Sequence, residues 1–437
     1  MNTKLREKLN SLSLDTGDIL LPKEGIDYGK WAVVACDQFT SQRDYWKKVE
    51  EITKDVPSTI HLIYPECYLE DGNKEKIIDE INSSMKSYLE KDIFTCYKDS
   101  FILVERSTSA GVRHGLVASL DLESYSYEKD SRSLIRATEG TILSRIPPRK
   151  EIRKNALLEL PHIMVLISDS RRSIIERLAA KKDSLPCVYD TELMLGGGHI
   201  RGYLVNSDED IGIVADGLQF LYDRLDKSNP LLYAMGDGNH SLATAKSLYE
   251  DLKQSIGPEK AKQHPSRWAL VEIENIFDPA LTFEAIHRVF FNTDEDTVAQ
   301  KIRSYCSSVE TEAVPSLDVL RQRINVNDGK IHFGLISGSR RTAWTVTSGR
   351  YSLGASIIQA CIDSLLEEGR TNVDYIHGAE VTERIASEEG NTGIIMSEIS
   401  KATFFDDIIK DGAFPRKTFS IGHAEEKRYY MEGRRIR

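Results

Sequence analysis

The stretch LLYAMGDGNHSLATAKSLYEDL, residues 231–252, decides how the middle of this chain folds. An apolar run precedes the polar turn GDGNHS, and apolar residues at helical spacing follow it. We therefore expect a central strand, a tight turn over Gly236–Ser241 and an amphipathic helix. Glycine permits positive φ and close backbone approach. The free N–H groups at a helix start attract phosphate oxygens.

Two interpretations of GDGNHS remain open at this point. In the first, the turn is a site: its backbone cradles a phosphate, Asp237 holds a divalent ion, and His240 contacts phosphate or moves a proton. In the second, the turn is an ordinary connection in which Asp237, Asn239 or Ser241 caps the helix. The spacing alone does not separate the two.

The composition bounds the class of protein. The chain has 437 residues, of which 40% are hydrophobic and 29% charged, and its formal net charge is −11. Such a chain is typical of a globular protein with two or three domains. The acidic balance argues against a general nucleic-acid binder. We see no long apolar run, no apolar leader and no closely spaced cysteines. We therefore expect a cytoplasmic protein without a membrane span, signal peptide or disulfide framework.

Strand-like and helix-like segments alternate along the chain, which favours an α/β (α+β) fold with mixed sheets. The expected strands are residues 31–36, 60–64, 101–107, 113–124, 162–168, 268–276, 331–336 and, as an exposed strand, 340–348; the expected helices are 74–90, 171–182, 208–228 and 355–367. Soft boundaries near residues 125 and 295 divide the chain into an N-terminal α/β region (1–125), a phosphate-binding core (126–295) and a C-terminal α/β region (296–437).

A second chemically dense segment surrounds TEGT. Glu139 lies between Arg136 and Arg145, and Arg149 and Lys150 follow. A carboxylate among cations keeps its charge and can act as a base toward a hydroxyl, and the cations can hold phosphate. The alternative is a solvated, salt-bridged helix face.

Three weaker candidates each have an ordinary structural alternative. In GGGHIRG, His199 and Arg201 follow glycines that could wrap an anion, or the segment is a hairpin turn. In FEAIHRVF, His287 and Arg288 lie on an apolar segment, where a histidine is more often part of the core. In DGAFPRKTFSIGH, Lys417 offers a cation, or the segment is a surface turn.

At GDGNHSLATA the chain resembles a bacterial and archaeal family of unknown function that is marked by a D-G-H-H-R-x-x-x-A signature. Four further elements of that family have similar segments here, in the same order: Thr138-Glu139-Gly140-Thr141, Ala285-Ile286-His287-Arg288, Tyr375-Ile376-His377 and Pro415-Arg416-Lys417-Thr418-Phe419. The D-G-H-H-R turn is also similar to that of the ParB and sulfiredoxin-like superfamily. Members of that superfamily bind nucleotide or phosphate at this junction and include free-serine kinases.

This resemblance implies a ParB/sulfiredoxin-like core elaborated by N- and C-terminal α/β regions, and a small-molecule kinase. The acceptor would be a hydroxyl, first of all that of free L-serine, and the donor ATP, ADP or pyrophosphate with Mg²⁺. Glu139 would be the base, His240 would contact the donor phosphate, and Asp237 would hold the metal. The residues expected to bind phosphate or substrate are Gly236, Gly238, Asn239, Ser241, Arg145, Arg149, Lys150, His199, Arg201, His287, Arg288 and Lys417.

The chain departs from the family pattern at three positions. Asn239 stands where the signature has its first His, Ser241 stands where it has Arg, and Thr138 precedes Glu139 in place of His. Losing the Arg removes a fixed cation that could clamp a phosphate. The alternative function is therefore a catalytically silent regulatory protein that senses a nucleotide or phosphate.

Overall fold

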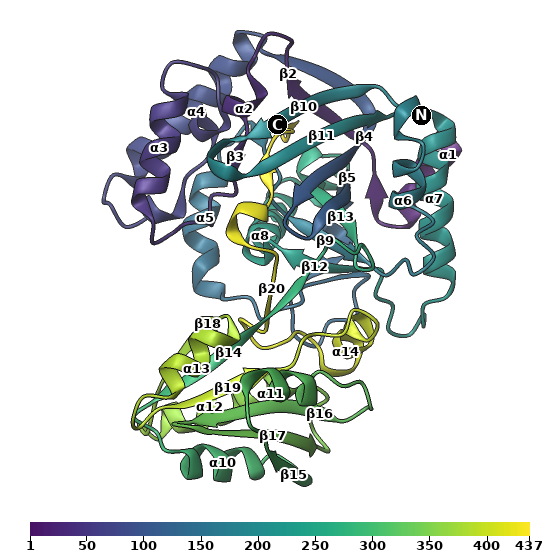
Figure 1. Ribbon diagram of the computed structural model, residues 1–437. Coiled ribbons are helices and arrows are strands. Elements are labelled where there is room, and N and C mark those ends of the chain that lie inside the picture. The colour runs from purple at the N-terminus through teal and green to yellow at the C-terminus, as the bar shows by residue number, and fades with distance from the viewer. The chain divides into compact units, whose positions relative to one another are not determined.

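The computed structural model describes residues 1–437, and the chain divides into two compact units. Unit 1 comprises residues 1–137, 141–282 and 422–437, and unit 2 comprises residues 138–140 and 283–421. Each unit is built on a large sheet of its own (Figure 1). The predicted boundary near residue 125 falls inside the sheet of unit 1, because strands from both sides of it pair. The division into three regions stays a prediction.

A mixed sheet of eleven strands forms the centre of unit 1. Its main path runs β10-β11-β4-β5-β13-β9-β12-β7-β6, while β1 pairs with β5 and β2 with β4. The strands are β1 (Leu14–Asp15), β2 (Gly17–Pro22), β4 (Phe94–Thr108), β5 (Gly111–Asp121), β6 (Tyr125–Ser126), β7 (Ile135–Arg136), β9 (Met164–Ile167), β10 (Cys187–Leu193), β11 (Gly198–Val205), β12 (Tyr233–Asp237) and β13 (Trp268–Asn275). β9 runs parallel to β13 but antiparallel to β12. The predicted fold class with mixed sheets is thus confirmed.

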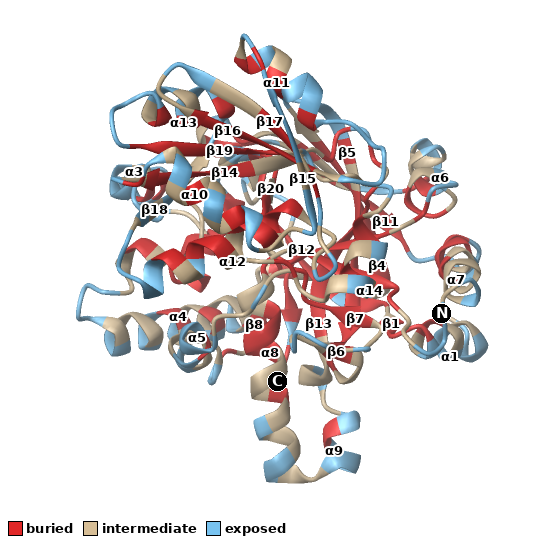
Figure 2. Cartoon of the chain, turned by 90° about the horizontal axis from the view of Figure 1, so that it is seen from below, coloured by how far each residue is buried: buried red, intermediate tan, exposed pale blue.

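Helices cover both faces of this sheet because its strands bury side chains on both sides. On β4, Phe101 and Leu103 join one core, while Ile102 and Val104 join the other. The first core is closed by α1 (Thr3–Ser11), α6 (Ile175–Ala179), α7 (Asp208–Asp223), α8 (Asn239–Ile256) and α9 (Pro258–Lys262); the second is closed by α2 (Tyr28–Trp31), α3 (Arg43–Thr53), α4 (Lys74–Glu90) and α5 (Ile146–Arg153). Figure 2 shows buried strands such as β12 and β13 among helices with exposed outer faces.

Residues 422–437 return to unit 1 and are held there by buried ion pairs. Two short strands anchor this segment: β21 (Tyr429–Tyr430) pairs with β3 (Val33–Val34), and β22 (Arg434–Arg435) pairs with β8 (Leu158–Glu159). The Arg428 guanidinium lies 2.5 Å from the Glu272 carboxylate and also binds Glu432. All three side chains are at most 2% exposed. Because an unpaired buried charge is strongly destabilising, these ion pairs hold the segment in its path.

Unit 2 is built on an antiparallel sheet with the order β15-β17-β16-β19-β14-β18, and β20 also pairs with β14. Its strands are β14 (Phe283–Phe291), β15 (Ser308–Ala313), β16 (Ile331–Ser337), β17 (Arg340–Thr347), β18 (Asn372–His377), β19 (Thr392–Met396) and β20 (Phe419–Ile421). α10 (Glu295–Arg303) and α12 (Gly354–Glu367) pack on one face, and α11 (Leu317–Ile324) and α13 (Ala379–Ala386) on the other. A further helix, α14, spans Phe404–Asp411.

Several predicted elements need correction. Residues 60–64 are not a strand, because Thr59–Leu62 form a 3-10 turn held by hydroxyl hydrogen bonds to the Trp31 carbonyl. The strand predicted at 31–36 is reduced to Val33–Val34, because the preceding residues belong to α2. The helix predicted at 171–182 covers only Ile175–Ala179, since the Asp169 carboxylate binds the backbone N–H groups of the preceding loop.

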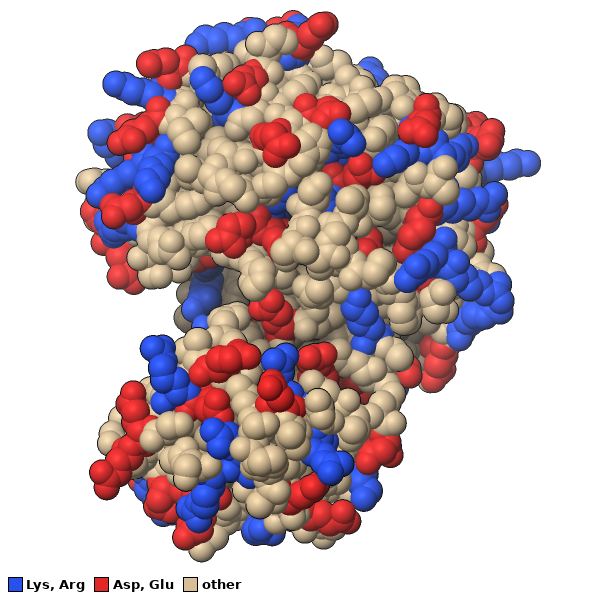
Figure 3. All heavy atoms as spheres, viewed as in Figure 1, with Lys and Arg blue, Asp and Glu red and all other residues tan.

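β17 was expected to be exposed, but it lies between β15 and β16 and buries Ala343, Trp344 and Val346. Elsewhere the spacing predicts well, and α4 covers residues 74–90 as expected. No helix combines the length and the apolar character needed to cross a membrane. On the face shown in Figure 3, Lys and Arg are interspersed with Asp and Glu.

Candidate functional site

The turn GDGNHS joins β12 to α8, as the sequence predicts. Gly238 has φ +79° and ψ 25°, the left-handed conformation that suits glycine. A Cβ atom at this position would lie 3.1 Å from Cα of Ile163, the residue before the neighbouring strand β9. Glycine is therefore required both by the backbone conformation and by the close approach.

No side chain caps α8, although the sequence offers three candidates. The N-cap residue is Gly238, and the Leu242 N–H donates to the Gly238 carbonyl at 3.1 Å. The arrangement in which Asp237, Asn239 or Ser241 caps the helix is therefore not found. An uncapped start of an 18-residue helix presents N–H donors and partial positive charge.

Asp237 is held by two donors. Its Oδ2 lies 3.0 Å from Nζ of Lys427, and its Oδ1 accepts from the Gly238 N–H at 2.7 Å. Burial works to raise the pKa of Asp237, but the charge and hydrogen bond of Lys427, the Gly238 N–H and the charge of His162 together lower it. Asp237 therefore stays ionised at neutral pH and fixes Lys427, which is 8% exposed, beside the turn.

The residues around Asp237 do not fit a resident Mg²⁺. Both carboxylate oxygens already accept from a cation or an N–H group. No group of three or more His, Cys, Asp or Glu side chains in the structure could hold a metal ion. Mg²⁺ prefers a near-octahedral set of oxygen ligands, which the two engaged oxygens of Asp237 do not supply.

A polar cluster continues from Asp237 toward β21. His162 Nδ1 lies 2.8 Å from the Tyr430 hydroxyl, and the Cys36 N–H donates to the same hydroxyl at 3.2 Å. His162 also contributes to the lowered pKa of Asp237. Segments around residues 36, 162 and 427–430, which are far apart in the sequence, thus contribute polar groups to one cluster that extends from Asp237.

The segment after TEGT also reaches the start of α8. The Ile142 N–H donates to Nε2 of His240 at 3.3 Å, so that ring nitrogen is a hydrogen-bond acceptor in this arrangement. Two nearby side-chain atoms, Oγ1 of Thr141 and Oδ1 of Asn239, are buried without a hydrogen-bond partner. Buried polar atoms of this kind normally have a partner, which makes them candidates to contact a ligand.

Arg145, Arg149 and Lys150 are carried by α5 and the turn before it. Arg149 binds the Glu66 carboxylate and also donates to the Arg145 carbonyl at 2.9 Å. Lys150 lies 2.5 Å from Asp251 on α8. α5 therefore packs against the helix that begins at the turn, but two of the three predicted cations, Arg149 and Lys150, already have carboxylate partners.

His199 and Arg201 lie in the β10–β11 hairpin, as the structural alternative for GGGHIRG expects. Both side chains contact Asp190, at 2.7 and 2.8 Å. Four strands, β4, β5, β13 and β9, separate β11 from β12 in the sheet. The structure thus does not place these two residues at the turn, and their phosphate-binding role stays a prediction.

The remaining predicted residues gather in unit 2. Arg288 on β14 lies opposite Tyr375 on β18, and the Ile286 N–H donates to the Thr418 carbonyl at 3.4 Å. Glu139 forms a backbone bridge to Phe414. His287 is buried, and its Nδ1 accepts from the Met396 N–H at 3.1 Å. Four of the five sequence elements of the family resemblance therefore meet within unit 2, whereas GDGNHS belongs to unit 1.

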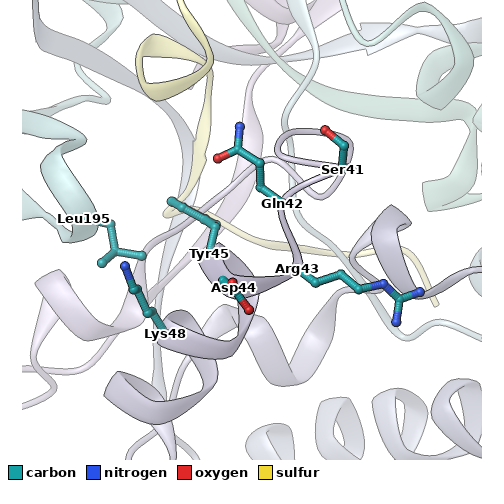
Figure 4. A pocket seen from close by; sticks show the side chains of 7 residues that line it. All are labelled: Ser41, Gln42, Arg43, Asp44, Tyr45, Lys48 and Leu195. Atoms are coloured by element: carbon teal, nitrogen blue, oxygen red, sulfur yellow. The ribbon is translucent and has the colours of Figure 1, made fainter.

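A separate pocket of about 650 Å³ lies beside the start of α3. It is lined by Ser41, Gln42, Arg43, Asp44, Tyr45, Lys48 and Leu195. Figure 4 shows Lys48 of α3 extending toward Leu195. None of the predicted site residues lines this pocket.

Sequence reasoning missed Lys427, His162 and Tyr430. Lys427 lies in EEKRYY, a short charged stretch with no motif, and His162 stands at the edge of an apolar run. The sequence feature they share is a polar residue next to a predicted buried strand. Many other positions in the chain have the same feature, so it does not identify a site.

The chain belongs to the family described as protein of unknown function (DUF1015), whose model matches residues 20–365. The predicted membership of a family of unknown function is confirmed at that level, and kinship with the ParB and sulfiredoxin-like superfamily stays a prediction. None of the curated proteins matches the sequence.

Three solved structures are similar over most of the chain. A free serine kinase in complex with AMP has 11% identity and a TM-score of 0.38, covering 72% of this chain and 90% of its own. A conserved hypothetical protein from Pyrococcus furiosus has 11% identity and a TM-score of 0.34, covering 70% and 90%. SbnI with a C-terminal truncation, from Staphylococcus aureus, has 8% identity and a TM-score of 0.35, covering 70% and 82%. Similarity this low carries no argument about function.

Proposed function

We propose that this chain binds a small phosphorylated molecule at the start of α8 and transfers its terminal phosphoryl group to a hydroxyl. The acceptor to test first is L-serine, and the donors are ATP, ADP and pyrophosphate. The observation that carries the proposal is the uncapped start of α8, with Lys427 fixed beside it by Asp237. Backbone N–H groups at a helix start together with a lysine are a common way of binding phosphate.

Each group at the turn has a role that follows from its position. The backbone after Gly238 donates to the phosphate oxygens, and the absence of a Cβ keeps the turn against Ile163. Lys427 offsets charge on the transferred group, because phosphoryl transfer depends on positioning and neutralisation. Asn239 Oδ1 and Thr141 Oγ1 offer contacts to the rest of the ligand.

In the transfer itself, the acceptor oxygen forms a bond to phosphorus while the bond from phosphorus to the leaving phosphate oxygen breaks. The proton of the hydroxyl must pass to a base. Glu139 is the predicted base, and this role stays part of the proposal. Replacing Glu139 by glutamine should then abolish turnover and leave the circular dichroism spectrum unchanged.

One observation favours a second candidate, a regulatory protein that binds the phosphorylated molecule without turnover. Asp237, which would hold a metal in a kinase, is instead engaged by Lys427 and the Gly238 N–H. In addition, Ser241 stands where the family signature has Arg. The turn can therefore bind a phosphorylated molecule, but it lacks one cation that would favour phosphoryl transfer.

A single assay separates the two candidates. The full chain is incubated with L-serine and each donor, with and without Mg²⁺, and phosphoserine is measured by mass spectrometry, while donor binding is measured by calorimetry. Phosphoserine with any donor supports the kinase. Donor binding without product across a panel of hydroxylated acceptors supports the regulatory protein. If no donor binds, both candidates are wrong.

A further inference from the structure

Arg288 of unit 2 is a buried cation with an unused hydrogen-bonding edge. The residue lies in the middle of β14 and is 0% exposed. Its Nη1 donates to the Ile286 carbonyl, whereas Nε and Nη2 have no hydrogen-bond partner. Nε and Nη2 form the side of a guanidinium that binds a carboxylate or phosphate with two parallel hydrogen bonds.

Arg288 shares the Tyr375 ring with a second cation, Lys417. Its guanidinium carbon lies 5.3 Å from the centre of the Tyr375 ring, and Nζ of Lys417 lies 5.9 Å from the centre of the same ring. The Tyr375 hydroxyl donates to Gln359 on α12 at 3.0 Å, which fixes the ring. Glu139 is the carboxylate whose charge acts on Arg288 within this unit.

Lys417 is held at this place by the local backbone. It has φ +56°, a conformation that a residue with a side chain adopts only when its surroundings impose it. The Thr418 hydroxyl donates to the Pro415 carbonyl at 2.5 Å, and the Thr418 carbonyl accepts from β14. The fold therefore directs a lysine and a buried arginine to one tyrosine ring.

Arg288 remains charged in spite of its burial. Burial lowers its pKa to about 10, although Tyr375 and Glu139 act in the opposite direction. A buried charge without its full set of hydrogen bonds is costly, by several kcal/mol in general. A stable fold can tolerate this unfavourable free energy when a ligand supplies the missing hydrogen-bond partner. The ligand group that matches the two N–H donors of a guanidinium edge is an oxyanion.

We infer that unit 2 contains an anion-binding site in which the Nε and Nη2 edge of Arg288 binds a carboxylate or phosphate group of a small molecule beside Tyr375 and Lys417. The inference takes up two residues that the sequence resemblance already implies in phosphate or substrate binding, Arg288 and Lys417, and assigns them to one site within unit 2. It does not rest on the transfer step of the proposed function.

The test observes Arg288 directly in the full chain labelled with ¹⁵N. The Nε–H resonance of Arg288 is assigned by its disappearance in Arg288→Lys. Acetate and inorganic phosphate are then titrated in separate arms, at an ionic strength held constant with chloride. We expect a saturable shift of this resonance with at least one of the two anions, and the arm that saturates first identifies the group recognised. No saturable shift in either arm would overturn the inference.

Two neighbouring exposed cations provide a matched pair. Lys417→Met should weaken the anion affinity several-fold, whereas Arg416→Met should leave it unchanged, because Arg416 has no contact with the Tyr375 ring. Equal weakening by both would mean that only overall charge matters, and would contradict a defined site. If Arg288→Lys does not fold, another resonance is followed during the titrations. It is chosen because Lys417→Met shifts it and Arg416→Met does not. A failure of the serine kinase assay leaves these readouts unaffected.

Discussion

Replacing Gly238 by alanine tests the turn at the start of α8. A left-handed conformation costs a residue with a Cβ about 1–2 kcal/mol. The new Cβ would also lie 3.1 Å from Cα and from Cγ1 of Ile163, and such overpacking costs about 1–3 kcal/mol. We therefore expect Gly238→Ala to lower the free energy of unfolding by about 2–5 kcal/mol, the sum of these two ranges.

Gly72 supplies the matched control. It has φ +78°, close to that of Gly238, but no atom lies within 4 Å of a Cβ placed there. Gly72→Ala should therefore show the conformational cost alone, about 1–2 kcal/mol. Both values are measured by urea unfolding.

Affinity for the phosphoryl donor is measured on the same two variants by calorimetry. Because Gly238→Ala moves the turn that presents the α8 N–H groups, we expect the affinity to fall at least about tenfold, or 1.4 kcal/mol. Gly72→Ala should leave the affinity unchanged. Unchanged affinity in Gly238→Ala, or an equal stability loss in both variants, would refute the reasoning.

Three further perturbations test other parts of the chain. Burial, helped by the charges of Arg288 and Arg321, lowers the pKa of His287 to about 4. The unfolded chain therefore takes up the proton first, and stability should fall by about 3 kcal/mol as the pH drops from about 6.5 to 4; urea unfolding of His287→Asn should lack this loss. Arg428→Met leaves Glu272 and Glu432 buried without their cation, so we expect a loss of at least about 3 kcal/mol in the same measurement, and an unchanged midpoint would contradict the ion-pair argument. Burial raises the pKa of Asp237, but Lys427, the Gly238 N–H and His162 together outweigh it and lower that pKa. The stability that the ionised Asp237 contributes is therefore present above about pH 4 and lost as the pH falls through the lowered pKa, and acid unfolding curves of Asp237→Asn should be flatter there than those of the wild type.

Local patterns predicted the elements that carry their own signal. α4 and the β12–α8 turn follow from apolar spacing and from a Gly-containing turn, both of which act within a few residues. The apolar run at 60–64 was misread, because hydroxyl groups of Ser58 and Thr59 fix a turn that apolar spacing does not reveal. Two-residue strands such as β21 have no periodicity at all.

The candidate site was predicted only in part for a related reason. The need for glycine at position 238 is local, and the sequence indicates it. The pairing of Asp237 with Lys427 depends on the path that residues 422–437 take through unit 1, and no spacing in the sequence encodes that path. Similarly, the unpartnered edge of Arg288 arises from what surrounds β14, which a motif of two letters cannot describe.

The return of residues 422–437 to unit 1 has a consequence for synthesis on the ribosome. Arg428, with its partners Glu272 and Glu432, and Lys427 beside Asp237 join unit 1 only after the whole of unit 2 has been translated. Until then Glu272 lacks its cation and the turn at Gly238 lacks its lysine. The nascent chain should therefore remain open to chaperones and proteases until this segment has emerged, and phosphate binding at the turn should appear only at that stage.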